Sequence, residues 1–241
     1  MKRLMDMTFS LFGLLLSSPI LLPTLFLVWL QDRHSPFYLA SRVGVNGKTF
    51  RIVKARSMVI NADRSGIDST AGDDSRITAV GHFIRRFKID ELTQLWNVLW
   101  GEMSLVGPRP NVERDVALYT KEEKKLLSVK PGITDLSSIV FSDEGEILKG
   151  HPNPDLGYNQ LIRPWKSRLG LFYIENQSLW LDLQLTFLTA VAIFAKPLAL
   201  QGIHKILRRK KVEPLLCQVA LREEKLSPYP PPGSVHIVQA R

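Results

Sequence analysis

The 241-residue chain is poor in cysteine, and its single thiol, Cys217, excludes an internal disulfide framework and a cysteine-rich zinc site. Acidic residues are also scarce, since 32 Lys and Arg face only 23 Asp and Glu and leave a formal charge of +9. This excess favours an anionic partner, such as nucleic acid, lipid headgroups or a phosphorylated substrate. The basic residues are scattered and no nucleic-acid-binding motif accompanies them, so we expect no nucleic acid partner.

Charge is wholly absent between Met7 and Gln31, where the sequence is strongly apolar. About 20 apolar residues suffice to cross the hydrocarbon core of a bilayer, so an ordinary spanning helix is one interpretation. A secretory signal peptide would end in a small-residue cleavage site, which residues 28–32 do not offer. The segment is therefore predicted to be an uncleaved membrane anchor.

A re-entrant anchor is the second interpretation. Pro19 follows Ser17 and Ser18 in the middle of the segment, and a proline inside a helix removes a backbone hydrogen bond. Basic residues flank the segment on both sides, so the positive-inside rule does not place its two ends on opposite faces. A helix broken at Ser18-Pro19 would satisfy both observations, with the two serine hydroxyls as candidate partners for the freed backbone groups.

The soluble part begins with a hairpin signal, Asn46-Gly47, between predicted strands 37–45 and 48–55. Alternation places Lys54 and Arg56 on one face of the second strand. The simplest interpretation is that both are solvated charges at the end of the strand. Residues 61–75 read as a loop whose acids lack the spacing of an EF-hand. Helices are predicted at 78–88, from Asp90 through Leu99, at 113–128, and at 155–172 with an interruption at Pro164.

The chain becomes apolar again at residues 178–200, with polar insertions such as Asp182. An interfacial helix with Trp180 and Phe187 at headgroup depth explains these insertions better than a second span. A basic cluster at residues 204–211 suits an anionic leaflet. The proline-rich stretch at 227–234 is not expected to build a core. We therefore predict an anchor (1–34), a catalytic domain (35–200) and a tail (201–241).

The densest group of chemically informative residues runs from Arg85 to Pro110, RRFKIDELTQLWNVLWGEMSLVGPRP. Asp90 alone would be explained as a helix N-cap and Glu91 as a first-turn acid. Nearby cations weigh against that reading, because the prolines around Arg109 present its guanidinium as a preorganised phosphate ligand. A proline-rich ligand for an SH3-like partner is the rival reading.

These blocks resemble a known family. KIDELTQLWNVLWGEMSLVGPRP, GKTFRIVKARSM, the amino-terminal KRLMD, the Ser-Pro of the apolar segment and KPGIT are similar to the bacterial sugar transferases, the monotopic polyprenyl-phosphate phosphoglycosyl transferases. The resemblance covers roughly residues 1–200 and several ordered blocks, which makes it more specific than a lone motif. It implies an α+β catalytic domain with amphipathic helices on a re-entrant membrane helix.

The resemblance also implies a chemistry. Asp90 would be the nucleophile that attacks the sugar-bearing phosphorus of a UDP-sugar, with release of UMP, and polyprenyl phosphate would then take the phosphosugar from the enzyme. Mg²⁺ would be held by Asp90 and Glu91. The expected phosphate ligands are Lys54, Arg56, Arg85 and Arg109.

The implied setting is the cytoplasmic face of a bacterial inner membrane, at the first membrane step of an exopolysaccharide, lipopolysaccharide O-antigen, capsule or other glycan pathway. Membrane lipids are expected partners, and a homodimer is left open. Thr93 stands where many members have proline, and residues after KPGIT depart from the common pattern, which leaves the sugar undetermined. A non-enzymatic, membrane-tethered interaction protein is the alternative function.

Overall fold

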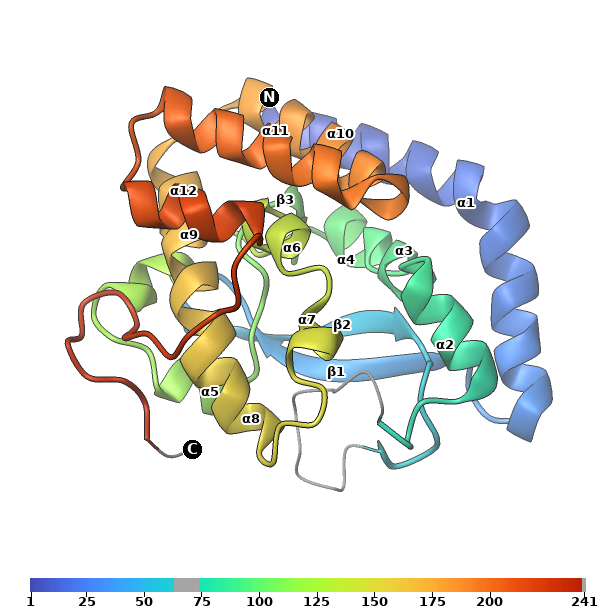
Figure 1. The fold of residues 1–241 in the computed structure, drawn as a ribbon. Coiled ribbons are helices and arrows are strands. Elements are labelled where there is room, and N and C mark those ends of the chain that lie inside the picture. Colours follow the sequence, from blue (N-terminus) through green and yellow to red (C-terminus); the bar gives the residue numbers. More distant parts are fainter. Residues whose placement is uncertain (63–73, 240–241) are drawn as a thin grey trace.

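The computed structural model describes residues 1–62 and 74–239 as a mainly helical body with two small sheets (Figure 1). The expected mixture of helices and strands is confirmed. Most of the predicted loop at 61–75 lies outside the described residues. The strands are β1 (Phe37–Val43), β2 (Thr49–Ala55), β3 (Ser104–Val106) and β4 (Gly132–Thr134). The principal helices are α1 (Lys2–Asp32), α2 (Ala79–Arg86), α3 (Ile89–Leu92), α4 (Leu95–Trp100), α9 (Arg163–Glu175), α10 (Leu179–Phe194), α11 (Lys196–Arg209) and α12 (Pro214–Leu221).

The hairpin predicted from Asn46-Gly47 is confirmed. Strands β1 and β2 pair antiparallel, with Phe37 opposite Ala55 and Val43 opposite Thr49. Asn46 and Gly47 both have positive φ, at 55° and 75°, which is the conformation that makes this dipeptide a hairpin signal. The second sheet joins β3 and β4 in parallel.

Helix α1 is one unbroken run of 31 residues with Pro19 and Pro23 inside it. The predicted break is therefore no gap in the helix, although Figure 1 shows α1 bending into two arms. Pro19 has no N–H for the carbonyl of Leu15, and the Ser18 hydroxyl donates to that carbonyl at 2.8 Å instead. The serine predicted to satisfy a freed backbone group does so, which lets the helix bend without losing continuity.

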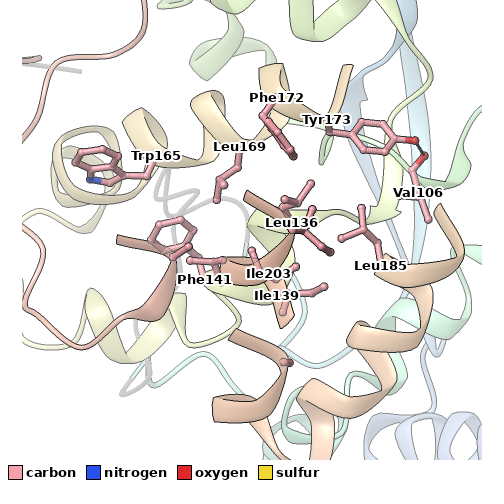
Figure 2. Packing of buried hydrophobic residues seen from close by; sticks show 14 of the residues in the cluster. Val106, Leu136, Ile139, Phe141, Trp165, Leu169, Phe172, Tyr173, Leu185 and Ile203 are labelled. Atoms are coloured by element: carbon pink, nitrogen blue, oxygen red, sulfur yellow. Dashed lines mark hydrogen bonds between the residues drawn. The ribbon is translucent and has the colours of Figure 1, made fainter. Parts of the chain in front are cut away.

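The main core lies between α9, α10, α11 and α6 (Leu136–Val140), with Leu136, Leu169, Leu185 and Ile203 all fully or almost fully buried (Figure 2). Helices α11 and α12 contribute side chains to the same core, including Leu207 and Cys217. The core thus continues past residue 200, where we expected the tail to begin.

The predicted helix at 113–128 forms two pieces, α5 (Glu113–Ala117) and a 3₁₀ helix, η3 (Glu123–Ser128). The reason is local. Glu123 N–H donates to Thr120 Oγ1 at 3.1 Å and Thr120 N–H donates to Glu123 Oε2 at 3.0 Å. This reciprocal capping box starts a new helix in the middle of the predicted one.

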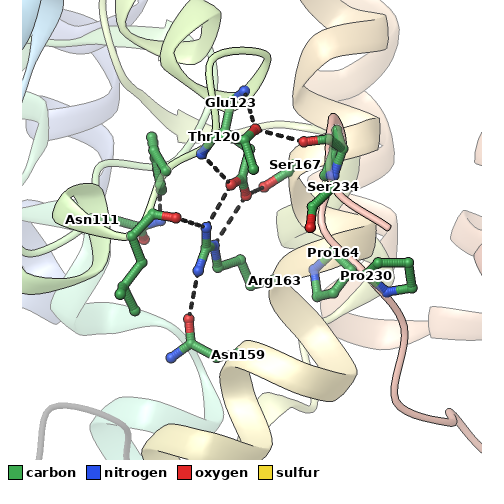
Figure 3. Close-up of polar contacts among 12 residues, drawn as sticks. Asn111, Thr120, Glu123, Asn159, Arg163, Pro164, Ser167, Pro230 and Ser234 are labelled. Atoms are coloured by element: carbon green, nitrogen blue, oxygen red, sulfur yellow. Dashed lines mark hydrogen bonds and ion pairs between the residues drawn. The ribbon is translucent and has the colours of Figure 1, made fainter. Parts of the chain in front are cut away.

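Glu123 also accepts from Arg163 Nε at 3.0 Å and from the Ser167 hydroxyl at 2.7 Å, and both side chains of the ion pair are buried (Figure 3). Arg163 donates further to Asn159 Oδ1 at 2.9 Å. The interruption expected at Pro164 takes the form of a π-helical turn, Tyr158–Ile162, directly before α9. Proline is tolerated there because it occupies the first turn of α9.

The proline-rich stretch is docked on this network. Tyr229 stacks on Trp165 with ring centroids 4.3 Å apart, and Arg168 donates to the Pro230 carbonyl at 3.0 Å. The Thr120 hydroxyl donates to the Pro232 carbonyl at 2.5 Å (Figure 3). A few aromatic and polar contacts therefore fix a segment whose composition alone predicts none.

Candidate active site

The Asp90-Glu91 pair lies on the four-residue helix α3. Lys88, just before it, has φ of 56°, so the chain turns sharply between α2 and α3. Helix α3 begins at Ile89 with Lys88 at the cap position, which excludes the reading of Asp90 as an N-cap. Asp90 is largely buried, at 8% exposure, and a strained backbone beside a buried carboxylate is typical of a functional site.

Strand β2 brings Lys54 to Asp90, with Lys54 Nζ 3.8 Å from Asp90 Oδ2. Two side chains fix the strand in this position. The Thr93 hydroxyl lies 2.9 Å from the Val53 carbonyl and 3.0 Å from that of Asp90. Asn97 accepts from Val53 N–H at 2.9 Å. A proline at position 93 could form neither hydroxyl contact, so this departure from the common pattern has a structural role here.

Arg109 binds the other carboxylate. Its Nη2 lies 2.6 Å from Glu91 Oε1, and its Nη1 donates to the Ile133 carbonyl at 3.0 Å. The approach of β3 to β4 places this arginine, and it depends on Gly107 and Gly132. A Cβ on Gly132 would lie 2.1 Å from the Gly107 nitrogen, which no side chain could relieve.

The acidic pair and the neighbouring cations shift one another's pKa values. Burial raises the pKa of Glu91, but Arg109, Lys88 and Lys54 outweigh it and bring the pKa down to about 2. Burial lowers the pKa of Lys54 to about 8, against the opposing attraction of Asp90. Burial also lowers the pKa of Arg85, whose guanidinium feels the charges of Asp90 and Asp74. Glu91 is thus an anion at any physiological pH.

The structure gathers Lys54, Arg85 and Arg109 around Asp90 and Glu91, but it places Arg56 elsewhere. The Arg56 guanidinium binds both oxygens of Asp32, at 2.5 and 2.7 Å, and its Nε donates to the Ser35 carbonyl at 2.9 Å. Arg56 therefore fastens the end of α1 to β2. Side-chain alternation along the strand could not predict this ion pair, because its acidic partner, Asp32, lies at the end of α1.

A third acid near the site was not predicted from the sequence. Glu144, at the start of α7 (Glu144–Ile147), is ion-paired with Lys166 of α9. Burial raises its pKa, but Lys166, Arg109 and Lys88 together lower it, which places Glu144 within electrostatic reach of the Arg109 side of the site. Glu144 and Lys166 belong to no recognisable motif, so their position near Arg109 could be seen only in the folded structure.

An apolar surface adjoins these charges. Helix α1 is long and apolar enough to cross a bilayer, and it exposes many large side chains, among them Leu11, Phe12, Leu15, Leu16, Ile20, Leu22 and Phe26. Trp100 on α4 and Trp180 and Phe187 on α10 are also well exposed. Exposed apolar area of this extent indicates membrane association.

The comparisons agree with these observations. The family model described as bacterial sugar transferase matches residues 1–196. The chain belongs to the bacterial sugar transferase family. This sugar transferase is 36% identical over 205 residues to the uncharacterized sugar transferase EpsL of Bacillus subtilis, covering 85% of this chain and 91% of EpsL. It is 33% identical over 207 residues to the exopolysaccharide production protein ExoY of Sinorhizobium fredii, covering 80% of this chain and 84% of ExoY.

Longer relatives carry more informative names. The undecaprenyl-phosphate galactose phosphotransferase of Salmonella typhimurium is 33% identical over 211 residues, covering 81% of this chain and 41% of the relative. The sugar transferase described here thus spans less than half of that protein. The enzymatic reading is confirmed by its family and by relatives named as phosphotransferases, and the non-enzymatic alternative is not retained.

Proposed function

We propose that this enzyme transfers a sugar 1-phosphate from a UDP-sugar to polyprenyl phosphate and releases UMP. The observation that carries the proposal is a buried carboxylate, Asp90, 3.8 Å from Lys54 and beside the Glu91–Arg109 ion pair, on a protein with a large exposed apolar helix. Both substrates are phosphate anions and one is a lipid. A cationic site next to a membrane-facing surface suits that combination.

The chemistry divides into two displacements at one phosphorus atom. In the first, a carboxylate oxygen of Asp90 attacks the sugar-bearing phosphorus, an O–P bond forms, and the bond to the UMP oxygen breaks. In the second, an oxygen of polyprenyl phosphate attacks the same phosphorus, and the bond to Asp90 breaks. The products are UMP, the polyprenyl diphosphate sugar and the free carboxylate. Dividing the transfer avoids bringing two bulky anionic substrates together in one step.

The cations have distinct tasks in this scheme. Lys54 faces Asp90 Oδ2 and offsets the repulsion between that carboxylate and the incoming diphosphate. Arg109 is held by Glu91 in a fixed orientation and leaves further N–H groups for a phosphate oxygen. Arg85 adds a third positive charge near Asp90.

Magnesium fits the residues present. Mg²⁺ is usually bound by one or two carboxylates together with substrate phosphates, and Asp90 and Glu91 supply two. No cluster of three or more His, Cys, Asp or Glu suited to a metal occurs among the described residues, so a cage made of protein ligands alone is not expected there. When bound, the ion would neutralise charge that develops on the phosphates.

The bent anchor supports a re-entrant topology. Lys2, at the start of α1, pairs with Asp182 of α10, and Asp32, at its end, pairs with Arg56, the residue after β2. A straight span would put these two ends on opposite sides of the bilayer, about 30 Å apart, whereas both contact one soluble body. We place that body at the cytoplasmic face of the bacterial inner membrane, in glycan synthesis such as that of exopolysaccharide or lipopolysaccharide.

A donor screen tests the proposal. The purified enzyme is incubated in detergent or nanodiscs with polyprenyl phosphate, Mg²⁺ and a panel of UDP-sugars, and UMP is measured. We expect UMP release with at least one donor, none with Asp90→Asn, and a radiolabelled sugar phosphate on the wild-type protein when the acceptor is omitted. Near-normal turnover by Asp90→Asn would remove Asp90 from the mechanism.

A further inference from the structure

Gln94 is a buried amide without a use in the fold. Its side chain is 1% exposed, and neither Oε1 nor Nε2 has a hydrogen-bond partner among the residues that the structure describes. Burying an amide without a partner costs about 1–3 kcal/mol, so such a group calls for an explanation.

The next buried amide on the same helical stretch shows the contrast. Asn97 Nδ2 donates to the Arg51 carbonyl at 2.7 Å and to Glu102 Oε2 at 2.8 Å, and its Oδ1 accepts from Val53. Asn97 is thus fully used in holding β2. Gln94, three residues earlier, contributes nothing comparable to the described fold.

Asp90, four residues before Gln94, also carries an unpartnered acceptor within the described part of the chain. Its Oδ1 is buried and lacks a hydrogen-bond donor within the described ranges, whereas Oδ2 faces Lys54. Thr93 and Gln94 link α3 to α4 with right-handed helical φ/ψ, so residues 90 and 94 lie about one turn apart, although Gln94 N–H bonds the Glu91 carbonyl rather than that of Asp90. An unpartnered amide and an unpartnered carboxylate oxygen thus lie about one turn apart along the described chain.

We propose that Gln94 is a positioning residue that acts through Asp90. Its Nε2–H donates to Asp90 Oδ1 when substrate is bound, which holds the carboxylate with Oδ2 directed at the phosphorus. Hydrogen bonds of this kind are often long or misaligned in a ligand-free enzyme and tighten in the substrate complex. After the first displacement, the Gln94 amide donates to the carbonyl oxygen of the aspartyl phosphate. The same hydrogen bond stabilises the Asp90 carboxylate when it leaves in the second displacement.

This inference rests on the proposed role of Asp90 as nucleophile, and the test separates the two. Gln94→Met keeps the shape of the side chain and removes the donor. We expect kcat to fall about 10- to 100-fold, as for a misplaced reacting group, with KM for the UDP-sugar changed by less than about twofold. The acceptor-free burst of UMP should slow by the same factor as kcat.

Thermal stability distinguishes positioning from a structural role. Because Gln94→Met removes an unpartnered buried amide, its melting temperature should equal or exceed that of the wild type. Asn97→Leu is the matched control on the same helix and should melt several degrees lower, since it breaks three bonds. Should Gln94→Met accumulate poorly, Gln94→Asn retains the amide but withdraws it by one methylene, and the same loss of kcat is expected.

Wild-type kcat in Gln94→Met, with Asp90→Asn inactive, would overturn this inference and leave the proposed function standing. A parallel fall in melting temperature and activity would also overturn it, because Gln94 would then be structural. Activity in Asp90→Asn would instead refute the proposed function itself.

Discussion

Lys2 Nζ lies 2.6 Å from Asp182 Oδ2, a contact between residues 180 positions apart that joins the first turn of α1 to α10. The same ammonium lies 3.0 Å from the Val106 carbonyl, and the Tyr173 hydroxyl donates to Asp182 Oδ1 at 2.7 Å. Asp6, one turn further, accepts from the Ser104 hydroxyl at 2.9 Å. The start of the membrane helix is therefore part of the soluble body.

Removing one partner of this pair should destabilise the protein. Asp182 is fully buried, so Asp182→Leu removes the carboxylate that Lys2 and the Tyr173 hydroxyl share and leaves the Lys2 charge unpaired, at a cost of about 2–4 kcal/mol. Thermal unfolding in detergent measures the loss. Glu122→Gln, which breaks the exposed pair with Lys125, is the control and should change stability by less than about 0.5 kcal/mol. Equal effects from the two variants would show that the buried pair has no special role.

Both ends of α1 should be accessible from the same side of the membrane. With Cys217 replaced by Ser, single cysteines are placed on an amino-terminal extension and at Ser35, in inverted vesicles and in intact cells. An impermeant maleimide should label both sites in inverted vesicles and neither in intact cells. Labelling of the extension in intact cells would refute the re-entrant model, while the catalytic assignment would survive.

The pH dependence should report Lys54. Its pKa of about 8 in the folded enzyme lies below the ordinary value of 10.5, so the charge that faces Asp90 is lost as pH rises through about 8, and kcat/KM should fall there. The folded state binds fewer protons than the unfolded state between these values, so stability should rise with pH in that window. Lys54→Arg stays charged and should lose the alkaline fall in kcat/KM. If kcat/KM of Lys54→Arg still falls at the same alkaline pH, a group other than Lys54 causes the fall.

Arg109 and Arg56 should respond differently to the same replacement. Arg109→Lys keeps the charge but loses the fork that joins Glu91 to a phosphate, so kcat/KM should fall at least about tenfold with little change in stability. Arg56→Lys should lower the melting temperature instead, because Arg56 binds Asp32 through two nitrogens. If Arg56→Lys loses activity at full stability, Arg56 has a direct role in catalysis.

Chelation tests the metal. Excess EDTA should stop UMP release, and added Mg²⁺ should restore it, because two adjacent carboxylates and two phosphate substrates need a counter-charge. Full activity in excess chelator would remove the ion from the mechanism.

The sequence predicts local features of this protein well. The Asn46-Gly47 hairpin depends on two residues that tolerate positive φ, and the side chain of Thr78 caps α2. The Asp90-Glu91 pair and Arg109, which contacts Glu91 in the structure, come from one contiguous block. Each depends on residues within a few positions of one another, where propensity and steric rules act directly.

Relationships across long separations could not be predicted in the same way. Alternation predicts Arg56 on the strand face that holds Lys54, yet β2 ends one residue earlier and Arg56 pairs with Asp32. Glu144 and Lys166 join the site only because α7 and α9 pack near Arg109. The proline-rich segment docks because Trp165 offers a surface to Tyr229. Composition and periodicity carry no information about such partners.

The attachment of Lys2 to Asp182 also sets an order of events during synthesis. Ribosomes add about 5–20 residues per second, so about 10–40 s pass between the appearance of the first residue and that of its partner 180 positions later. For most of this interval the apolar helix is complete, but Lys2 has no Asp182 to bind. A nascent chain stalled before residue 182 should therefore hold the start of α1 only through its contacts with residues 104–106, and the attachment is complete only when α10 has been made.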